Sequence, residues 1–445
     1  MDASRTLNRI AATGALLLWV AACGSGGGST PAPTATPPAG FAYVANELDN
    51  TVSIYSVGAG GQLSALGYVP AGTSPLSVTV DPQSRFAYAA NLGSADVSAY
   101  AINATTGALT PISCMPGGTA VCTGSNFTAE AGATSVVIHP SGKFAYVANF
   151  TASNVSQYAI ASSGALTPLA ASAVAAGTNA SAIAVHPAGA FAYVANYTSN
   201  DVSAYRIDAT GALTRISCGP PGTAGCSGAT EPTDFAAGTN PFSLAIDPAR
   251  KFAYVTNYGS SDISAYTINT TTGALTQVSC GPVGTPGCTG TTAPTNFANG
   301  TGAISIVVDP TGKFAYAANL ASNDVSAYAI DPPTGALTHI SCGTPGTAGC
   351  VGTTEPTNFA AGRGANAVAI DPTGKFAYVA NLDSNNVSAY TIDAAGKLTP
   401  ISCGAVGTQG CSGTTLPTLF AAGTAPVSLV VAKPGTSTSL PSPAP

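Results

Sequence analysis

Short alternations of apolar and polar residues recur along most of the chain. Residues 366–402 read as four such runs, NAVAIDP, TGKFAYVANL, SNNVSAYTI and GKLTPIS. In the second run Phe376 and Tyr378 alternate with smaller residues, as in strands whose two faces pack differently. Asp371–Gly374 and Ala395–Gly396 carry turn residues between runs. The pattern predicts a meander of four antiparallel strands.

The same unit repeats along the chain. Copies of FAYVAN, FAYAAN or FAYVTN begin at residues 41, 86, 144, 191, 252, 314 and 376, so the period is 45 to 62 residues. Four-stranded units at this period predict an all-β fold, a β-propeller. The first copy has no inner strand before it, and the last inner strand, residues 427–432, has no copy after it. We therefore expect seven four-stranded antiparallel blades, with the C-terminal strand closing the ring on residues 41–46 and leaving no exposed strand edge there.

An asparagine closes every copy. We expect these residues to begin the turn into the third strand, where the side chain can bond to the backbone and tolerate left-handed geometry. A ring of ligand-binding asparagines is the alternative. The predicted turn-forming ring consists of Asn46, Asn91, Asn149, Asn196, Asn257, Asn319 and Asn381.

The segment DPTGKFAYVANLDSNNVSAYTID and the inner VAIDP and IAVHP strands resemble YVTN-type propeller repeats. Such repeats occur in bacterial and archaeal surface proteins and in lactonase-type seven-bladed propellers, and the resemblance covers about residues 41–433. It implies the propeller fold and suggests lactone hydrolysis. Members that hydrolyse lactones use charged channel residues such as Arg, His and Glu, and no position here matches them. We assign no catalytic residue.

The N-terminus predicts export. Arg5 and Arg9 precede a short apolar stretch, residues 10–20, as in a signal peptide of residues 1–22. Val20-Ala21-Ala22-Cys23 resembles a bacterial lipobox, which implies lipidation of Cys23; a plain secretory signal is the alternative. Residues 23–40 then form a flexible Gly/Ser/Pro tether, residues 41–433 the propeller, and residues 434–445 a disordered tail.

Ten further cysteines form five C-x7-C pairs. No histidine lies near any pair, so short disulfide loops in an oxidising compartment are expected rather than zinc sites. The expected disulfides are Cys114-Cys122, Cys218-Cys226, Cys280-Cys288, Cys342-Cys350 and Cys403-Cys411. These inserts should emerge on the same face as the asparagine turns, called here the loop face, and raise a rim over it.

Charge limits the partners. The net charge of −6 and the low content of charged residues, 7%, argue against nucleic acid, because phosphate neutralisation needs clustered Lys and Arg. The sequence has no nucleophile elbow, phosphate loop or metal-spaced histidines, so we expect no cofactor and no metal. His139, His186, Asp247, Asp309 and Asp371 each precede a proline and are expected to be turn residues.

Three charged residues depart from the repeat on the expected loop face. Glu47 follows Asn46 where other blades have Leu, Phe or Tyr, Arg363 replaces the usual Thr, and Glu130 lies in the connection before the third blade. They are candidate ligand residues; solvated loop charges without a role are the alternative.

The neutral inner strands and the expected disulfide-closed inserts favour a non-catalytic module that binds a protein or carbohydrate partner through the loop face. A lactonase-type hydrolase, similar to 6-phosphogluconolactonase, is the alternative, and a structural envelope protein is the third. We expect a monomer, held by its N-terminal lipid to a membrane of the bacterial cell envelope, either periplasmic or surface-exposed on the outer membrane.

Overall fold

A computed structural model describes residues 37–112, 122–123, 126–221, 226–227, 233–284, 288–289, 295–345, 347, 350–351, 357–405, 411–412 and 419–433. The chain divides into two units, residues 1–37 and 38–445, and only Pro37 of the first is described. The described residues form strands and turns and no helix, so none of them forms a helix able to cross a membrane.

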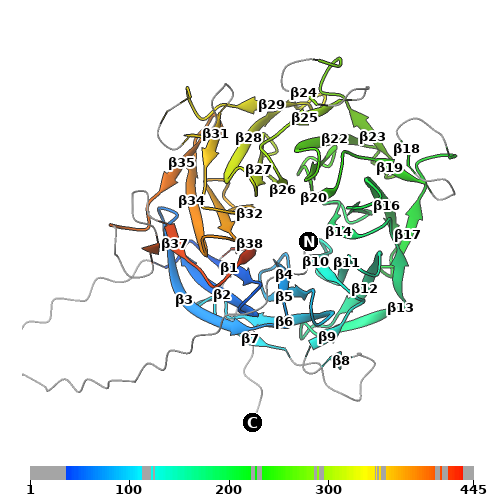
Figure 1. Ribbon diagram of the computed structural model, residues 1–445. Coiled ribbons are helices and arrows are strands. Elements are labelled where there is room, and N and C mark those ends of the chain that lie inside the picture. The colour runs from blue at the N-terminus through cyan, green and yellow to red at the C-terminus, as the bar shows by residue number, and fades with distance from the viewer. Residues whose placement is uncertain are drawn as a thin grey trace, which may run out of the picture. The chain divides into compact units, whose positions relative to one another are not determined.

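Seven blades surround a central axis (Figure 1). The seven inner strands follow one another around it. Their bounds are β4 (Pro75–Val80), β10 (Ala133–Ile138), β14 (Ala180–Val185), β20 (Pro241–Ile246), β26 (Ala303–Val308), β32 (Ala365–Ile370) and β38 (Pro426–Ala432). The second strands are β1 (Gly40–Asn46), β5 (Phe86–Asn91), β11 (Phe144–Asn149), β15 (Phe191–Asn196), β21 (Phe252–Asn257), β27 (Phe314–Asn319) and β33 (Phe376–Asn381). Blades are numbered one to seven in the order of these second strands.

Third strands run antiparallel to the second ones. They are β2 (Thr51–Val57), β6 (Asp96–Ile102), β12 (Asn154–Ile160), β16 (Asp201–Ile207), β22 (Asp262–Ile268), β28 (Asp324–Ile330) and β34 (Asn386–Ile392). In blade one, β38 pairs with β1, with Phe41 opposite Ala432. The predicted seven-bladed ring and its closure by the C-terminal strand are confirmed.

Outer strands are of two kinds. Blades one and three have one continuous outer strand with a register shift, β3 (Leu63–Pro70) and β13 (Leu166–Ala175). In the other five blades the outer strand is divided into two parts. The first parts are β7 (Leu109–Pro111), β17 (Leu213–Ile216), β23 (Leu275–Val278), β29 (Leu337–Ile340) and β35 (Leu398–Ile401), and the second parts are β9 (Asn126–Thr128), β19 (Asp234–Ala236), β25 (Asn296–Ala298), β31 (Asn358–Ala360) and β37 (Leu419–Ala421).

The cysteine inserts lie between these two parts. A short strand of each insert pairs with the outer side of the second part and so widens the blade: β8 (Cys122–Thr123), β18 (Cys226–Ser227), β24 (Cys288–Thr289), β30 (Cys350–Val351) and β36 (Cys411–Ser412). The described insert strands therefore lie at the circumference (Figure 1). The expected rim over the loop face is wrong for them, because the returning strand takes the free edge of the third strand.

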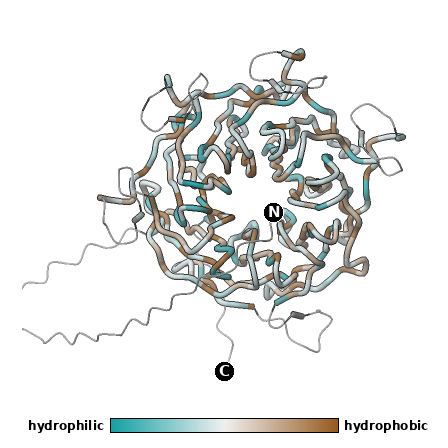
Figure 2. The backbone as a smooth tube through the Cα atoms, viewed as in Figure 1, coloured by the Kyte–Doolittle hydropathy of each residue, from teal (hydrophilic) through white to brown (hydrophobic). Residues whose placement is uncertain are grey.

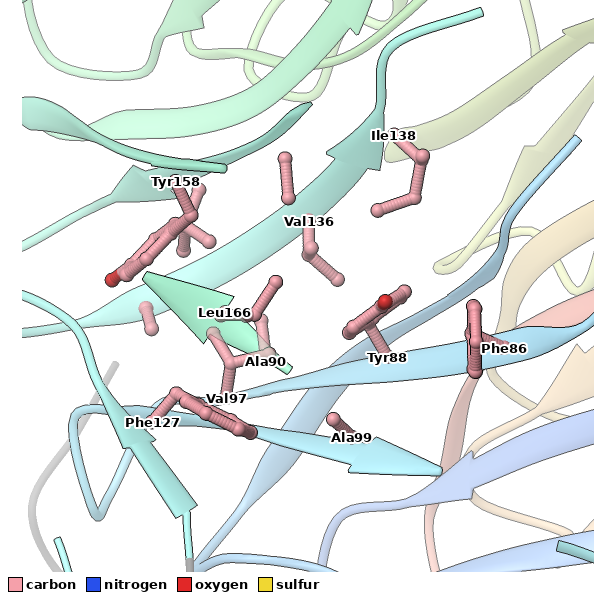
Figure 3. Close-up of a cluster of buried hydrophobic side chains, with 13 residues drawn as sticks. Phe86, Tyr88, Ala90, Val97, Ala99, Phe127, Val136, Ile138, Tyr158 and Leu166 are labelled. Atoms are coloured by element: carbon pink, nitrogen blue, oxygen red, sulfur yellow. The ribbon is translucent and has the colours of Figure 1, made fainter. Parts of the chain in front are cut away.

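Hydrophobic segments recur in every blade (Figure 2) and pack between neighbouring blades. Seven buried clusters fill the seven interfaces. Between blades two and three, Phe86 and Tyr88 of β5 face Val136 and Ile138 of β10 (Figure 3). Burial of this apolar surface is the main force that holds the blades together.

The repeated Phe and Tyr have specific partners in the next blade. Each FAY tyrosine donates its hydroxyl to the backbone carbonyl of a turn glycine there, as Tyr43 does to Gly107 at 2.9 Å. The FAY phenylalanine covers the same glycine, where a Cβ atom would lie 2.2 to 2.5 Å from the ring. That glycine also has positive φ, 71° at Gly107, so two constraints require it.

Candidate active site

Side chains of the inner strands are uncharged around the axis. The third residue of five inner strands is a serine, and its hydroxyl accepts a hydrogen bond from a backbone N–H of the following blade. Ser77, for example, accepts from Val136 at 3.3 Å. These serines join successive inner strands, and none of their positions supplies an acid or base. An acidic or basic side chain for catalysis would therefore have to lie at one end of the axis.

The asparagine ring is buried at the loop-face end of the second strands. Each side-chain amide donates to the residues five and seven positions later, as Asn91 does to Asp96 at 2.6 Å and Ser98 at 3.0 Å. We expected bonds to the turn backbone, and the partners are instead third-strand side chains. The left-handed residue of the turn lies four positions after the asparagine, for example Ala95 with φ 53°.

A glycine covers six of these asparagines. It precedes the inner strand by three residues, as Gly238 does, and a Cβ there would lie 2.4 to 2.6 Å from the nearest atoms of the asparagine amide or its hydrogen-bonded neighbours. Glu130 stands at this position in blade three and is exposed. The asparagine ring is thus enclosed by the protein itself, which argues against a ligand-binding role for it.

The residue after each asparagine lies beside the inner strand on the loop face. Its N–H donates to the carbonyl of the residue that precedes the inner strand, as Glu47 does to Ala425 at 2.9 Å. Six of these seven positions hold apolar or aromatic side chains. In order they are Glu47, Leu92, Phe150, Tyr197, Tyr258, Leu320 and Leu382.

Aromatic side chains lie side by side in blades three to five and form what is called here the aromatic arc. Phe150 and Tyr197 lie 5.8 Å apart between centroids, and Tyr197 makes an edge contact with Phe242 of β20 at 6.2 Å. Tyr258 follows in blade five, and all four side chains are partly exposed. This aromatic arc offers apolar ring faces to a ligand.

Glu47 lies in blade one, on the part of the ring away from the arc. Its side chain is half-buried, and burial raises the pKa of its carboxyl group above the ordinary glutamate value. A carboxylate with a raised pKa is a stronger base than an exposed glutamate. Our sequence reasoning found Glu47 only as a departure from the repeat; its partial burial needed the structure.

Arg363 lies in the connection into blade seven, next to blade one. Its carbonyl accepts the N–H of Asp383 at 3.1 Å, and its side chain is exposed. Glu47, Glu130 and Arg363 thus share the loop face, but none of them takes part in the ion pairs of the described residues. They occupy three different blades, so the structure places them on one surface without joining them.

The residues before proline lie at the other end of the axis. Asp81, Asp247, Asp309 and Asp371 accept backbone N–H groups of their own turns, so their role there is structural. His139 and His186 reach the next blade, where His139 contacts the carbonyl of Gly189 at 2.9 Å. No group of side chains suited to a metal occurs in the part of the chain that the structure describes.

Four insert cysteines, Cys218, Cys280, Cys342 and Cys403, are disulfide-bonded. Cys114 and the side chains of Cys122, Cys226, Cys288, Cys350 and Cys411 lie outside the described residues. The C-x7-C pairing therefore stays a prediction, because no complete pair is described. Cys23 also lies outside them.

The sequence matches the model of the family described as lactonase, seven-bladed β-propeller, over residues 28–124, 116–226 and 291–410. It matches none of the curated proteins with which it was compared. Among solved structures, a putative 6-phosphogluconolactonase from Bacteroides fragilis is similar with a TM-score of 0.66 and 18% identity, over 90% of this chain and 100% of that one. The periplasmic gluconolactonase of Pseudomonas aeruginosa is similar with a TM-score of 0.64 and 16% identity, over 88% of this chain and 99% of that one. At these identities the structures support the fold alone.

The family match contradicts our expectation of a non-catalytic binding module and favours the lactonase alternative. That expectation was wrong because it took the neutral inner strands as evidence against catalysis. Charged side chains at the loop-face end of the axis, such as Glu47 and Arg363, could supply the chemistry that the inner strands do not. The matched segments span more than half of the chain, which therefore belongs to the lactonase family of seven-bladed β-propellers.

Proposed function

We propose that this protein hydrolyses lactones at the loop-face end of the propeller axis. The observation that carries the proposal is the family match over both halves of the ring. The loop face adds a half-buried glutamate, Glu47, an exposed cation, Arg363, and the aromatic arc. These are the kinds of groups that hydrolysis of a small cyclic ester requires.

Hydrolysis needs a base and stabilisation of negative charge. In the proposed reaction water attacks the carbonyl carbon of the lactone and its proton passes to the Glu47 carboxylate. The ring C–O bond then breaks, and the proton moves from Glu47 to the leaving alkoxide, which gives the open hydroxy acid. The raised pKa of Glu47 brings this base closer to neutral pH.

The other two features bind the substrate. Negative charge develops on the carbonyl oxygen during attack, and a nearby cation stabilises it. Arg363, in the blade next to Glu47, is the candidate for this role. The aromatic arc of Phe150, Tyr197, Phe242 and Tyr258 lies away from Glu47 and offers its ring faces to an apolar substituent that extends from the lactone ring.

The experiment measures acid release from a panel of sugar and aliphatic lactones by wild type, Glu47→Gln and Glu130→Gln. We expect Glu47→Gln to lower kcat by about a hundredfold or more, as loss of a general base does. Glu130→Gln is the matched control, because it makes the same change at an exposed glutamate of the same face, and it should retain activity.

The pH profile gives a second readout. Since Glu47 acts as its carboxylate and burial raises its pKa, wild-type activity should fall on acidification at a higher pH than an ordinary glutamate would give. Equal activity of Glu47→Gln and wild type would place the base elsewhere. Absence of turnover of every lactone by wild type would contradict the function itself.

A further inference from the structure

Basic residues are unevenly distributed between the two faces of the ring. Nine of the eleven lysines and arginines in the described part lie at the face opposite the loop face, in the turns that join first to second and third to fourth strands or at strand ends beside them. This face is called the basic face below. Its members are Arg85, Lys143, Arg206, Arg250, Lys251, Lys313, Lys375, Lys397 and Lys433.

Five of them occupy one position of the repeat, directly before the FAY phenylalanine. They are Arg85, Lys143, Lys251, Lys313 and Lys375, and all five side chains are exposed. Arg85 pairs with Asp81 at 3.2 Å, whereas the four lysines take part in none of the ion pairs of the described residues. The ring symmetry thus spreads positive charge around the face rather than into one pocket.

Carboxylates on the basic face offset only part of this charge, because seven are described there against nine basic residues and only three of the seven are exposed. Asp81, Asp247, Asp309 and Asp371 are buried and accept backbone N–H groups of their turns. Three others are exposed at hairpin turns and bond to their own turns. These are Asp208, Asp331 and Asp393. The exposed surface therefore carries mainly positive charge.

The loop face has the opposite sign. Only two of the described basic residues lie there, and Arg215 is largely buried in an ion pair with Asp234. Four described carboxylates of this face are at least partly exposed, Glu47, Asp49, Glu130 and Asp383. Five more are buried there: Asp96, Asp201, Asp234, Asp262 and Asp324. The ring is therefore charge-polarised along its axis, although the net charge of the whole chain is only −6.

Both ends of the ring emerge at the basic face. β1 begins there at Gly40, whose neighbour Ala39 donates its N–H to Val57, and β38 ends there before Lys433. The segment predicted to carry the lipidated Cys23 thus joins the propeller on its positive side.

We propose that the basic face binds the surface of a membrane that contains anionic phospholipid. Lysine and arginine near such a surface are attracted over about a Debye length, and a ring of them engages several headgroups at once. The face that carries the chain ends then lies on the membrane. The loop face, with Glu47 and the aromatic arc, points to solvent and stays open to small molecules.

The test uses the chain from residue 24 onward, which contains every described strand ladder. Its binding to vesicles of phosphatidylcholine is compared with binding to vesicles that also contain phosphatidylglycerol, by sedimentation at low and high salt. We expect binding only to the anionic vesicles, and its loss at about 1 M salt, where the Debye length falls to about 3 Å.

The variant replaces Lys143, Lys251, Lys313 and Lys375 by Gln. Its matched control replaces Thr73, Thr178, Thr239 and Thr301, four exposed loop-face residues, by Glu, which changes the net charge by the same amount. The lysine variant should lose at least about tenfold in partition to anionic vesicles, and the threonine variant should keep its binding.

Three outcomes would overturn the proposal. One is equal binding of wild type to both kinds of vesicle. Another is an equal loss in the two variants, since net charge rather than the basic face would then control binding. The third is release from the vesicles by millimolar inorganic phosphate, which would indicate a site for a free anion. Circular dichroism of each variant checks that the blades are folded.

Discussion

At the residue scale, a buried polar triad closes the loop-face end of each blade. The asparagine amide always donates to a serine hydroxyl seven residues later. Its second acceptor, the residue five positions after the asparagine, varies between blades. It is Asp in four blades, Asn in blades three and seven and Thr in blade one. Because the amide needs only an acceptor, a charged partner is not required by the fold.

Replacing Asp324 by asparagine tests whether the fold needs a charged partner at this position. Burial raises its pKa, so the folded chain holds the proton more tightly than the unfolded chain does. Its contribution to the free energy of unfolding is therefore greatest below the unfolded pKa and is lost as the pH rises through the folded pKa. Asp324→Asn, which copies Asn386 of blade seven, should be more stable than wild type at neutral pH.

The difference in stability between Asp324→Asn and wild type should become smaller as the pH falls. Urea unfolding midpoints of both proteins in acidic and neutral buffer measure this difference. Asp383→Asn removes an exposed carboxylate of the same face and is the control, with little effect expected. A midpoint for Asp324→Asn that is lower than that of wild type at neutral pH would contradict the prediction.

At the element scale, one pair of side chains joins the two parts of the divided outer strand in blades four, five and six. In blade four Arg215 of β17 pairs with Asp234 of β19. The same positions hold Gln277 and Asn296 in blade five, 2.9 Å apart, and His339 and Asn358 in blade six, also 2.9 Å apart. The second residue is Asp where the first is Arg and Asn where the first is Gln or His, so each blade keeps a polar contact that holds the second part of the outer strand in place.

Exchange between blades tests this contact. Arg215→Gln should lower the free energy of unfolding by roughly 3 kcal/mol, because it leaves the buried Asp234 without its cation. The double variant Arg215→Gln with Asp234→Asn copies blade five and should recover most of the loss. Thermal unfolding measures both. A double variant no more stable than the single one would show that the pair does not act as a unit.

At the scale of the whole molecule, the seven-bladed ring separates charge between its two faces. The acidic loop face carries the proposed active site, and there Arg363 is the exposed cation among the described residues. A phosphorylated lactone approaching this face meets charge of its own sign, whereas an uncharged lactone does not. If Glu47 is the base as proposed, the charge of this face should discriminate between the two substrates before they reach it.

We therefore expect kcat/KM for an uncharged sugar lactone to exceed that for its phosphorylated counterpart by about tenfold or more at low ionic strength. The difference should narrow when salt screens the face, while kcat/KM for the uncharged lactone stays nearly constant. Steady-state hydrolysis at two salt concentrations measures this. Preference for the phosphorylated lactone at low salt would contradict it.

The blades, their number and their order around the ring could be predicted from the amino-acid sequence alone. It could do so because seven copies of one strand pattern carry the same Phe, Tyr and Asn, and because an unpaired strand at each end leaves one way to close. The turn at Ala395–Gly396 is also local, whereas the contact of Gly396 with Phe314 of the neighbouring blade is not.

The remaining features could not be predicted from the sequence, because they depend on neighbours that are distant along the chain. The acceptors of the asparagine amides, the outward course of the inserts and the partial burial of Glu47 follow from how third strands, returning strands and adjacent blades meet. The separation of Lys and Arg from Asp and Glu between the two faces arises in the same way. A single copy of the repeat shows only one or two charges, and closing seven of them into a ring brings these charges together on one surface.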